Sequence, residues 1–447
     1  MNSSPREHRT PRQCHMRREQ GLAAPDLSGR SPSRIFAADW LSRERNVNEG
    51  AALAGLRVLD LSDYRGQLCA RMLADMGADV IKVEPPDGDG ARRIGPFVDD
   101  LPHRDRSLFF WFYNLNKRSL TLDLENPRGR EILASLARGA DLVVESFAPG
   151  TLAKAGLGWA ALHAVNPALI LLSIAPFGQS GPYRDWAADD TVLAALGGML
   201  YVNGSPGRAP VRPLGLQAYH ASAYYAAIAV LCALFARDRD GAGQWIDLSM
   251  QEATAAAVEH VAGSYFGDGR IEPRRGTLHW SRYFRVGKCR DGYIMHCTLG
   301  DWTSLVEWVA GDGKAQDLTA PEWNDVVYRA THAEHLFDVL DEWVKDYSRD
   351  ELLERAQTLR LPYATVRQPE ALLEDEQLAA RGYFVEVEHL ELGRTIRYPG
   401  APYLFNGSPW RVYRRPPLTG EHTAEILREA LGFDAGELAA LAAEGII

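Results

Sequence analysis

The sequence predicts an α/β protein in which a doubly wound, Rossmann-like large domain carries a smaller α+β domain. The first observation is that apolar runs alternate with helix-like segments from residue 56 onward, as in a parallel sheet with helical crossovers. The second is that this alternation gives way near residue 265 to shorter and more mixed segments. The chain of 447 residues is also too long for one domain, because domains typically hold roughly 100–200 residues.

The strand candidates of the large domain are short apolar runs. They lie at residues 56–61, 79–84, 119–124, 141–146 and 168–178. Helix-like segments separate them at residues 67–77, after Asn126-Pro127 and at residues 159–166. Because neighbouring parallel strands need long, usually helical, crossovers, this order predicts one parallel sheet with helices on both faces.

An alanine-rich segment at residues 214–236 is long enough to span a bilayer. It also carries Gln217, His220, Ser222 and three tyrosines, and burying such polar groups in lipid is costly. We therefore predict a buried core helix and no membrane span. The residues that follow, 241–250, then supply a turn and another strand, and residues 251–263 begin a further helix.

The remaining chain indicates the domain boundaries. Strand candidates at residues 282–287 and 292–297 precede helical patterns, and helices return near the C-terminus. No apolar signal segment stands at the start. We predict a disordered extension (or a wrongly assigned start), the large domain, the small domain and a C-terminal segment returning to the large domain, at residues 1–52, 53–265, 266–395 and 396–447.

Composition narrows the functional classes. Hydrophobic residues make up 46% of the chain, charged residues 24%, and the formal net charge is -10, which is typical of a globular protein and argues against nucleic acid as the main partner. The five cysteines include no C-x-x-C pair. The sequence therefore predicts no metal site, and reduced thiols in a cytoplasmic protein.

Two strand-end turns are candidate ligand contacts, because ligands of parallel sheets bind at the carboxyl ends of strands. In the first, Arg65 supplies charge and Gly66 permits close approach, although an ordinary tight turn fits as well. In the second, at residues 116–119, Lys117 and Arg118 form a basic pair suited to phosphates, although a solvated edge fits as well. No G-x-G-x-x-G or G-K-[ST] loop is present there, which argues against a dinucleotide or NTP site.

These segments, taken together and in order, resemble the class III CoA-transferases, which include formyl-CoA transferase and α-methylacyl-CoA racemase. The resemblance runs from about Leu53 to the C-terminus. The matching segments are LAGLRVLDLS, MLADMGADVIKVEPP, NLNKRSLTLDLENPRGREI, ADLVVESFAPGTLAKAGLGW, NPALILLSIAPFGQSGPY, ALGGML, ARDRDGAGQWIDLSMQEA, LLEDEQLAARGYF and LTGEHTAEIL.

The resemblance implies acyl-CoA and carboxylic acid substrates, and CoA lying across the large domain. It also implies ring-like monomers that interlock as a dimer. Where the family often carries Asn-Phe, this chain has Ser146-Phe147. Carried over residue by residue, the implied CoA contacts are Arg65, Gly66, Leu122, Asp123, Leu124, Glu125, Ser146, Phe147, Lys154 and the segment at residues 187–190.

The family's nucleophile is missing from its expected position. In the transferases an aspartate attacks the acyl-CoA carbonyl to form a mixed anhydride, which the released CoA thiolate converts to an aspartyl-CoA thioester. Counting back from the GAGQ segment places Tyr219 at the aspartate position, and no Asp or Glu occurs from Thr191 through Arg237. A phenol ionises only near pH 10 and makes a less activated ester.

Three interpretations remain open. The chain is the non-nucleophilic subunit of a hetero-oligomer whose paralogous subunit carries the aspartate. Alternatively, it is an acyl-CoA isomerase or racemase, lyase or hydrolase that uses His220, Asp189 or Asp190 as acid and base. Finally, it is a non-enzymatic acyl-CoA-binding protein. His220 has a structural alternative too, since a histidine in an alanine-rich helix is often a hydrogen-bonded core residue.

Overall fold

A computed structural model describes residues 50–447, apart from the side chain of Glu259. Most of the predicted extension at residues 1–52 lies outside the described residues. The large lobe is built on a six-stranded parallel sheet in the order β3-β2-β1-β4-β5-β6, which confirms the predicted doubly wound topology. Its strands are β1 (Arg57–Asp60), β2 (Asp79–Glu84), β3 (Arg118–Thr121), β4 (Leu142–Glu145), β5 (Ile170–Ala175) and β6 (Trp245–Ser249).

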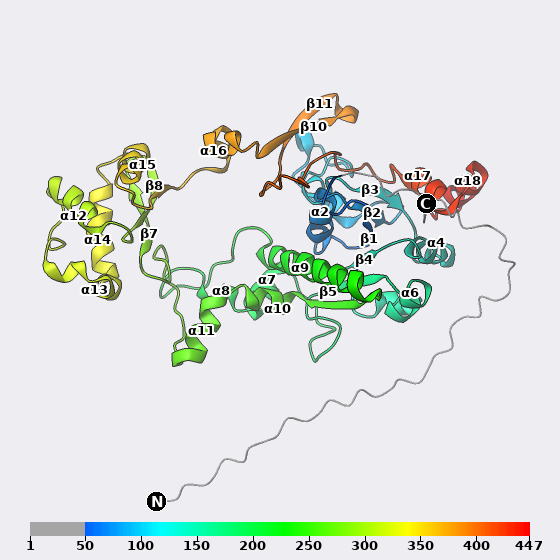
Figure 1. Ribbon diagram of the computed structural model, residues 1–447, viewed down its shortest axis with the longest axis horizontal. Helices are drawn as coiled ribbons and strands as arrows, with labels where there is room; N and C mark the ends of the chain where they lie inside the picture. Colours follow the sequence, from blue (N-terminus) through cyan, green and yellow to red (C-terminus); the bar gives the residue numbers. More distant parts are fainter. Residues whose placement is uncertain (1–49) are drawn as a thin grey trace, which may run out of the picture.

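Helices cover both faces of this sheet (Figure 1). Alternate strand residues point to opposite faces, so Val144 belongs to the core beside α9 whereas Val143 belongs to the core on the other face. The helices of the first face are α2 (Gln67–Asp75) and α9 (Gln217–Asp240). Those of the second face are α4 (Pro127–Ala137), α6 (Trp159–Val165), α17 (Thr423–Leu431) and α18 (Ala435–Ala443).

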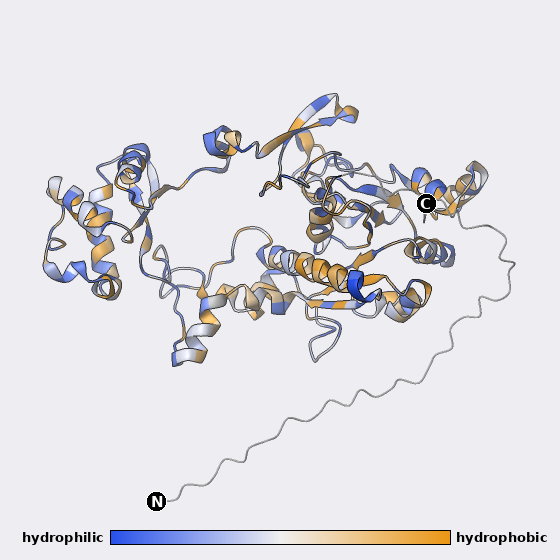
Figure 2. Ribbon diagram, viewed as in Figure 1, coloured by the Kyte–Doolittle hydropathy of each residue, from blue (hydrophilic) through white to orange (hydrophobic). Residues whose placement is uncertain are grey.

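Helix α9 is apolar around most of its circumference (Figure 2). By length and composition it is the one helix of the described chain that could cross a membrane. One face, including Ala223 and Val230, is buried in the core, whereas Ile228 and Phe235 on the opposite face are 58% and 76% exposed. The prediction of a buried helix is therefore correct for one face and wrong for the other, because the sheet covers only one side.

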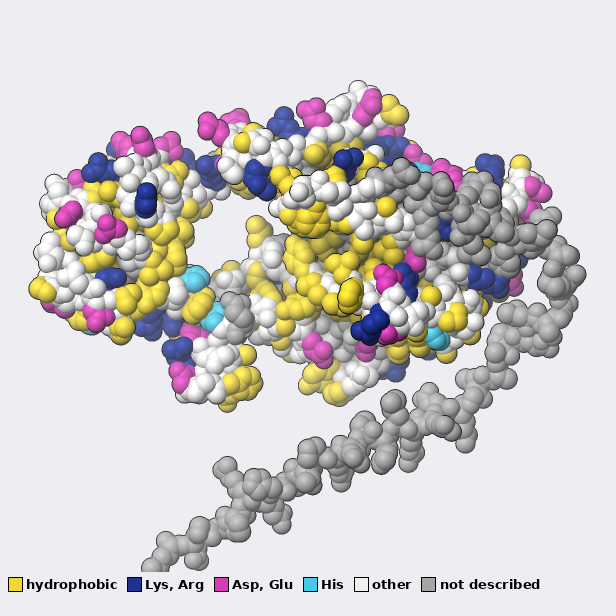
Figure 3. Space-filling view, viewed as in Figure 1, with side chains coloured by type: hydrophobic (Ala, Val, Ile, Leu, Met, Phe, Trp, Pro, Cys, Tyr) yellow, Lys and Arg dark blue, Asp and Glu magenta, His cyan; other side chains and the backbone are white. Residues whose placement is uncertain are grey.

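The small lobe has a separate core that includes Trp323, Phe337 and Trp343. It combines a three-stranded antiparallel sheet with helices, as predicted. Its elements are β7 (Phe284–Cys289), β8 (Gly292–Cys297), β9 (Ala364–Thr365), α12 (Trp302–Gly311), α13 (Val326–Thr331), α14 (Ala333–Val344) and α15 (Arg349–Thr358). Two connections join it to the large lobe, and the space-filling view shows an opening between them (Figure 3).

The remaining elements form these connections and the edges of the large lobe. The hairpin of β10 (Phe384–His389) and β11 (Arg394–Pro399) packs on Phe110 and Trp111, and the C-terminal segment then returns to α17 and α18. The predicted domain boundaries stay predictions. The other helices are α3 (Leu108–Asn114), α5 (Thr151–Lys154), α7 (Asp190–Leu196), α8 (Met199–Val202), α10 (Met250–Ala256), α11 (Glu259–Asp268) and α16 (Glu376–Ala380).

Candidate active site

The turn after β1 is bound to the end of β4, its neighbour in the sheet. Arg65 pairs with Asp63 at 2.8 Å, and its Nη2 donates to the Ser146 carbonyl at 2.6 Å. The Asp63 N–H donates to Ser146 Oγ at 2.9 Å, and the hydroxyl donates back to the Asp63 carboxylate. The structure thus brings together Arg65 and Ser146, two of the residues predicted to contact CoA.

Gly66 has a packing role in this turn. Its backbone φ is -113°, which any residue can adopt. A Cβ at this position would lie 2.7 Å from Ser62 Cβ, closer than real Cβ contacts allow, and 3.1 Å from Ile174 Cδ1. The glycine is therefore required because the turn packs closely on the protein itself, and its contact with CoA stays a prediction.

Tyr219 lies in the first turn of α9, beside the same turn after β1. Its ring meets the ring of Tyr64 edge to face, with centroids 5.9 Å apart, and the residue is only 3% exposed. Burial raises the pKa of the phenol above its ordinary value, so Tyr219 stays protonated at neutral pH. A protonated, buried phenol is a poor nucleophile.

Asp190, a predicted acid or base, caps the start of α9. Its Oδ1 accepts hydrogen bonds from the N–H groups of Ala218 and Tyr219 at 2.9 and 3.2 Å. Burial raises the pKa of this carboxyl, and the two backbone hydrogen bonds oppose the rise. Asp189, by contrast, is exposed and caps α7 through the N–H of Val192.

His220 is held by a tyrosine that the sequence analysis did not single out. Its Nε2 lies 2.8 Å from the hydroxyl of Tyr113 in α3. Burial raises the pKa of Tyr113 to about 12 and lowers the pKa of His220. At neutral pH both groups are therefore uncharged. The hydrogen bond engages the Nε2 atom of His220 with the Tyr113 hydroxyl.

The other predicted CoA contacts lie at the carboxyl ends of β3 and β4. Leu122 is buried in the core, and the Asp123 N–H donates to the Ile446 carbonyl at the C-terminus. Leu124 is partly buried, and Glu125 and Lys154 are exposed. Phe147 is partly buried against the core of the second face. Among the described residues no cluster of His, Cys, Asp or Glu is arranged to hold a metal ion.

The basic pair at the start of β3 is committed to the protein's own carboxylates. Lys117 is fully buried and donates to Asp60 at 2.7 Å. Arg118 pairs with Asp79 at 2.7 Å and with Glu425 and Glu429 of α17. The prediction that this pair serves phosphates is therefore wrong, because both basic residues are buried and already paired with the protein's own carboxylates. Removing Lys117 from its pair would leave the buried Asp60 without a counter-charge.

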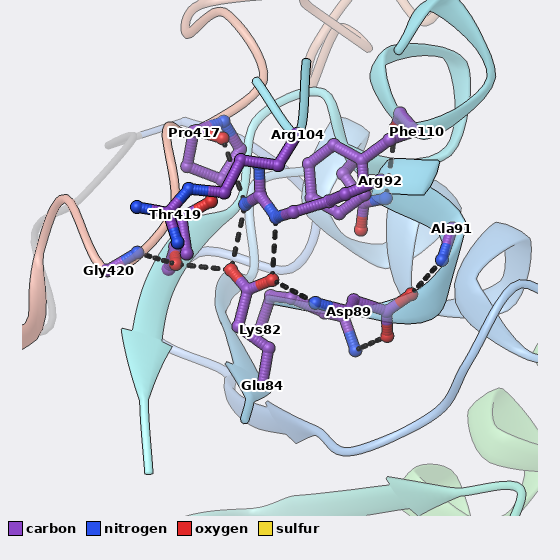
Figure 4. Close-up of polar contacts among 12 residues, drawn as sticks. Lys82, Glu84, Asp89, Ala91, Arg92, Arg104, Phe110, Pro417, Thr419 and Gly420 are labelled. Atoms are coloured by element: carbon purple, nitrogen blue, oxygen red, sulfur yellow. Dashed lines mark hydrogen bonds and ion pairs between the residues drawn. The ribbon is translucent and has the colours of Figure 1, made fainter. Parts of the chain in front are cut away.

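Further buried charges close the carboxyl ends of β2 and β3 (Figure 4). Arg92 pairs with both carboxylate oxygens of Glu84, at 2.7 and 2.8 Å, and Lys82 pairs with Asp89 at 2.9 Å. Ser119 donates to Glu84 and accepts from the Gly420 N–H of the C-terminal segment. This network connects β2 and β3 with the C-terminal segment, which is far from them in sequence.

Comparisons with known proteins agree with this architecture. A family model described as CoA-transferase family III matches residues 53–423. The chain is 36% identical over 398 residues to subunit BbsE of succinyl-CoA:(R)-benzylsuccinate CoA-transferase from Thauera aromatica, covering 87% of this chain and 96% of the relative. It is 31% identical over 391 residues to the beta subunit of succinyl-CoA–L-malate CoA-transferase from Chloroflexus aurantiacus, covering 85% and 94%.

A solved structure, a CAIB/BAIF family protein from Brucella suis, matches with a TM-score of 0.76 at 29% identity, over 85% of this chain and 99% of that protein. The relatives are named as CoA-transferases, which favours an enzyme over a non-enzymatic binding protein. Because the family model spans most of the chain and the relatives align over nearly their full length, the protein belongs to CoA-transferase family III and is an enzyme of CoA transfer.

Proposed function

We propose that this chain is the non-nucleophilic subunit of a hetero-oligomeric CoA-transferase, and that a paralogous subunit supplies the catalytic aspartate. The observation that carries the proposal is Tyr219 at the family's aspartate position, in a segment without any Asp or Glu from Thr191 through Arg237. Both subunit-named relatives support it, because each is one component of a transferase with more than one kind of chain.

The chemistry requires a carboxylate at the reacting position. Attack of a carboxylate on an acyl-CoA carbonyl expels CoA thiolate and forms an anhydride, which the thiolate can reopen. The buried phenol of Tyr219 would give a less activated ester, and its raised pKa keeps it protonated. The nearest polar candidates form hydrogen bonds within the protein, since Asp190 caps α9 and His220 is hydrogen-bonded to Tyr113.

In this proposal the chain contributes CoA contacts and the shape of the assembly. Arg65, Ser146 and Phe147 lie at adjacent strand ends, where the family resemblance expects CoA. The acceptor and donor are carboxylic acids and their CoA esters, and succinyl-CoA is the first donor to test because both relatives are named for it. The cytoplasmic location stays a prediction.

The assembly we propose is an interlocked one, with a second subunit passing through the opening between the lobes (Figure 3). The exposed apolar face of α9 supports it, because such a face is normally covered in the working protein. Its residues are Tyr224, Tyr225, Ile228, Leu231 and Phe235, which are 41–76% exposed. Light scattering at micromolar concentration tests this part, and a stable monomer in both the isolated and co-expressed preparations would contradict it.

Co-expression tests the division of roles. The chain is purified alone and together with a paralogue that carries aspartate at the matching position, ideally one encoded by a neighbouring reading frame. CoA transfer from succinyl-CoA to a second carboxylic acid is then measured. We expect transfer from the pair and none from the isolated chain; robust transfer by the isolated chain would show that another group has taken over.

The second interpretation, an acyl-CoA isomerase or racemase, lyase or hydrolase, has less support from the geometry. It needs a free base near Tyr219, whereas the Nε2 of His220 is hydrogen-bonded to the Tyr113 hydroxyl at 2.8 Å. Incubation of the isolated chain with succinyl-CoA in deuterated water separates this interpretation from the first. Exchange at the α-carbon, or release of free CoA, would favour it.

A further inference from the structure

A pocket of about 570 Å³ lies on the face of the sheet opposite α9. Its floor is formed by Ser173 of β5 and Trp245 of β6, and one wall by Trp159 at the start of α6. Gln179 and Arg184, from the loop after β5, complete the lining together with Glu145 at the end of β4. Its volume lies in the range of small-molecule sites, which are mostly apolar with a few convergent polar groups.

The body of the pocket is apolar and held in a fixed shape. The Trp245 indole N–H donates to Ser173 Oγ at 3.0 Å, which fixes the ring against β5, while the residue stays 45% exposed. Trp159 stacks on His163 with ring centroids 4.5 Å apart. Two oriented indole rings and the side chain of Leu152 therefore form surfaces suited to an aryl or alkyl group.

The polar end of the pocket has donors without acceptors. Gln179 Nε2 and Arg184 Nε are buried and form no hydrogen bond. The nearest carboxylate to Arg184 is Asp185, whose oxygen lies 3.8 Å from Nε. A Cβ on Gly150 would lie 3.0 Å from Arg184 Nη2, so the glycine leaves room for the guanidinium. Unsatisfied buried donors are costly, and an acceptor placed between them would remove that cost.

Glu145 completes the polar end and is only 5% exposed. Burial raises the pKa of its carboxyl to about 7. Four groups from neighbouring elements modify this effect: hydrogen bonds from Ser173 and the Phe147 N–H and the charge of Arg65 lower the pKa, and the charge of Asp247 raises it. Near neutral pH a large fraction of Glu145 is thus protonated and is a hydrogen-bond donor.

We propose that this pocket binds a monocarboxylic acid with an aryl or alkyl body, whose carboxylate accepts from Arg184 and Gln179 and lies beside the buried side chain of Glu145. A carboxylate is the class of ligand that these donors fit, because a guanidinium pairs well with it and it offers four lone-pair sites. The indole rings of Trp159 and Trp245 would enclose the apolar body. The inference is independent of the proposed division of catalytic roles.

Occupancy of the pocket would act on the predicted CoA contacts from the opposite side of the strand end. Glu145 Oε2 accepts from the N–H of Phe147 at 2.7 Å, and Ser146 binds the turn after β1. A ligand that fixes Glu145 therefore also fixes this stretch of chain. By linkage, we expect a bound acid to raise or lower the affinity of the chain for CoA.

Calorimetry and tryptophan fluorescence of the full-length chain test the proposal, with 3-phenylpropanoate as probe and 3-phenylpropanol as its uncharged control. At about pH 6 the acid should bind about tenfold or more tightly than the alcohol. Arg184→Gln should weaken binding of the acid by a similar factor and leave binding of the alcohol unchanged. The matched control is Arg128→Gln, at an exposed arginine of α4 paired with Glu131, which should change neither.

The pH dependence provides a second and independent readout. Raising the pH from about 6 to about 8 ionises Glu145, which removes its donor and adds a negative charge, so the acid should bind about tenfold more weakly. Glu145→Gln keeps the shape and a donor and should abolish that pH dependence. The proposal is overturned if a folded Arg184→Gln variant binds the acid like the wild type, if acid and alcohol bind equally, or if neither binds.

Discussion

The two sides of the central sheet differ in how the protein satisfies its polar side chains. On the side of β1, β2 and β3, Lys82, Arg92 and Lys117 each pair with a carboxylate of the protein. On the side of β4 and β5, the Nε2 of Gln179 and the Nε of Arg184 have no hydrogen-bond partner, and both residues line a pocket. A basic residue at a strand end is therefore evidence of a ligand only when its own chain does not already satisfy it.

The active-site region, at the turn after β1 and the end of β4, lies between these two sides of the sheet. It contains both a paired arginine and a buried uncharged side chain. Arg65 is paired with Asp63 but stays partly exposed at the turn, whereas Tyr219 is buried and neutral. In the proposed function this region contributes to CoA binding, and the paralogous subunit supplies the carboxylate for covalent chemistry. The following predictions test each part of this comparison, beginning with the largest effect.

Removing the buried ion pair between Lys117 and Asp60 should reduce the stability of the protein the most. Lys117→Met removes the cation that pairs with Asp60, when both side chains are fully buried, and should lower the free energy of unfolding by about 3–5 kcal/mol. The control is Arg128→Met, whose pair with Glu131 is exposed and should matter by about 0.5 kcal/mol or less. Urea unfolding followed by circular dichroism measures both, and equal effects would contradict the distinction.

The buried carboxyl of Glu145, beside the pocket, should make the stability of the protein depend on pH. Burial raises the pKa of Glu145 from 4.5 to about 7, so the folded state binds a proton that the unfolded state has released between those values. Stability from this group is fully present below about pH 4.5 and is lost as the pH rises through about 7, by up to about 3 kcal/mol. Relative to Glu145→Gln, the wild type should lose stability between about pH 5 and about pH 8; a constant difference would contradict the assignment.

Two substitutions of Asp190, the residue that caps α9, distinguish a structural role of its side chain from a catalytic one. Asp190→Ala removes the acceptor for two backbone N–H groups and should lower stability by about 1–2 kcal/mol. Asp190→Asn keeps an acceptor oxygen and should preserve most of the stability and of the transfer activity of the co-expressed enzyme. If the asparagine variant is stable but its transfer falls about a hundredfold or more, Asp190 acts as an acid or base.

Tyr219→Phe should have the smallest effect. It removes the hydroxyl and keeps the edge-to-face contact with Tyr64. If the phenol is not a nucleophile, transfer by the co-expressed enzyme should change by less than about threefold, whereas Asp→Asn at the matching position of the paralogue should abolish it. A loss of transfer in Tyr219→Phe at unchanged stability would contradict the proposed division of roles.

Much of the fold could be predicted because its signals are local. The strands β1, β2, β4 and β5 are short apolar runs, and Asn126-Pro127 marks the start of α4 through the Asn126 side-chain cap. The absence of Asp and Glu from Thr191 through Arg237 also follows from sequence alone, so no alignment shift within that segment can supply a carboxylate. The structure adds that Tyr219 lies against Tyr64 of the turn after β1.

The errors arose where partners are distant in sequence. Lys117 pairs with Asp60 across 57 positions and Arg118 with Glu425 across 307, so the basic pair looked free when only its neighbours were visible. Tyr113 stands in an aromatic run without polar spacing, and its contact with His220 spans 107 positions. The pocket around Glu145 combines residues of several strands, helices and a loop, and no local pattern identifies it.

Chemical trapping tests the central claim most directly. The co-expressed enzyme is incubated with succinyl-CoA, treated with hydroxylamine or borohydride, and digested for peptide mass spectrometry of both subunits. Hydroxylamine and borohydride mark an aspartyl thioester at the carboxyl group. We predict a modified aspartate in the paralogue and no succinyl-CoA-dependent adduct on the peptides of this chain that span Tyr219. An acyl or CoA adduct on those peptides would contradict the account.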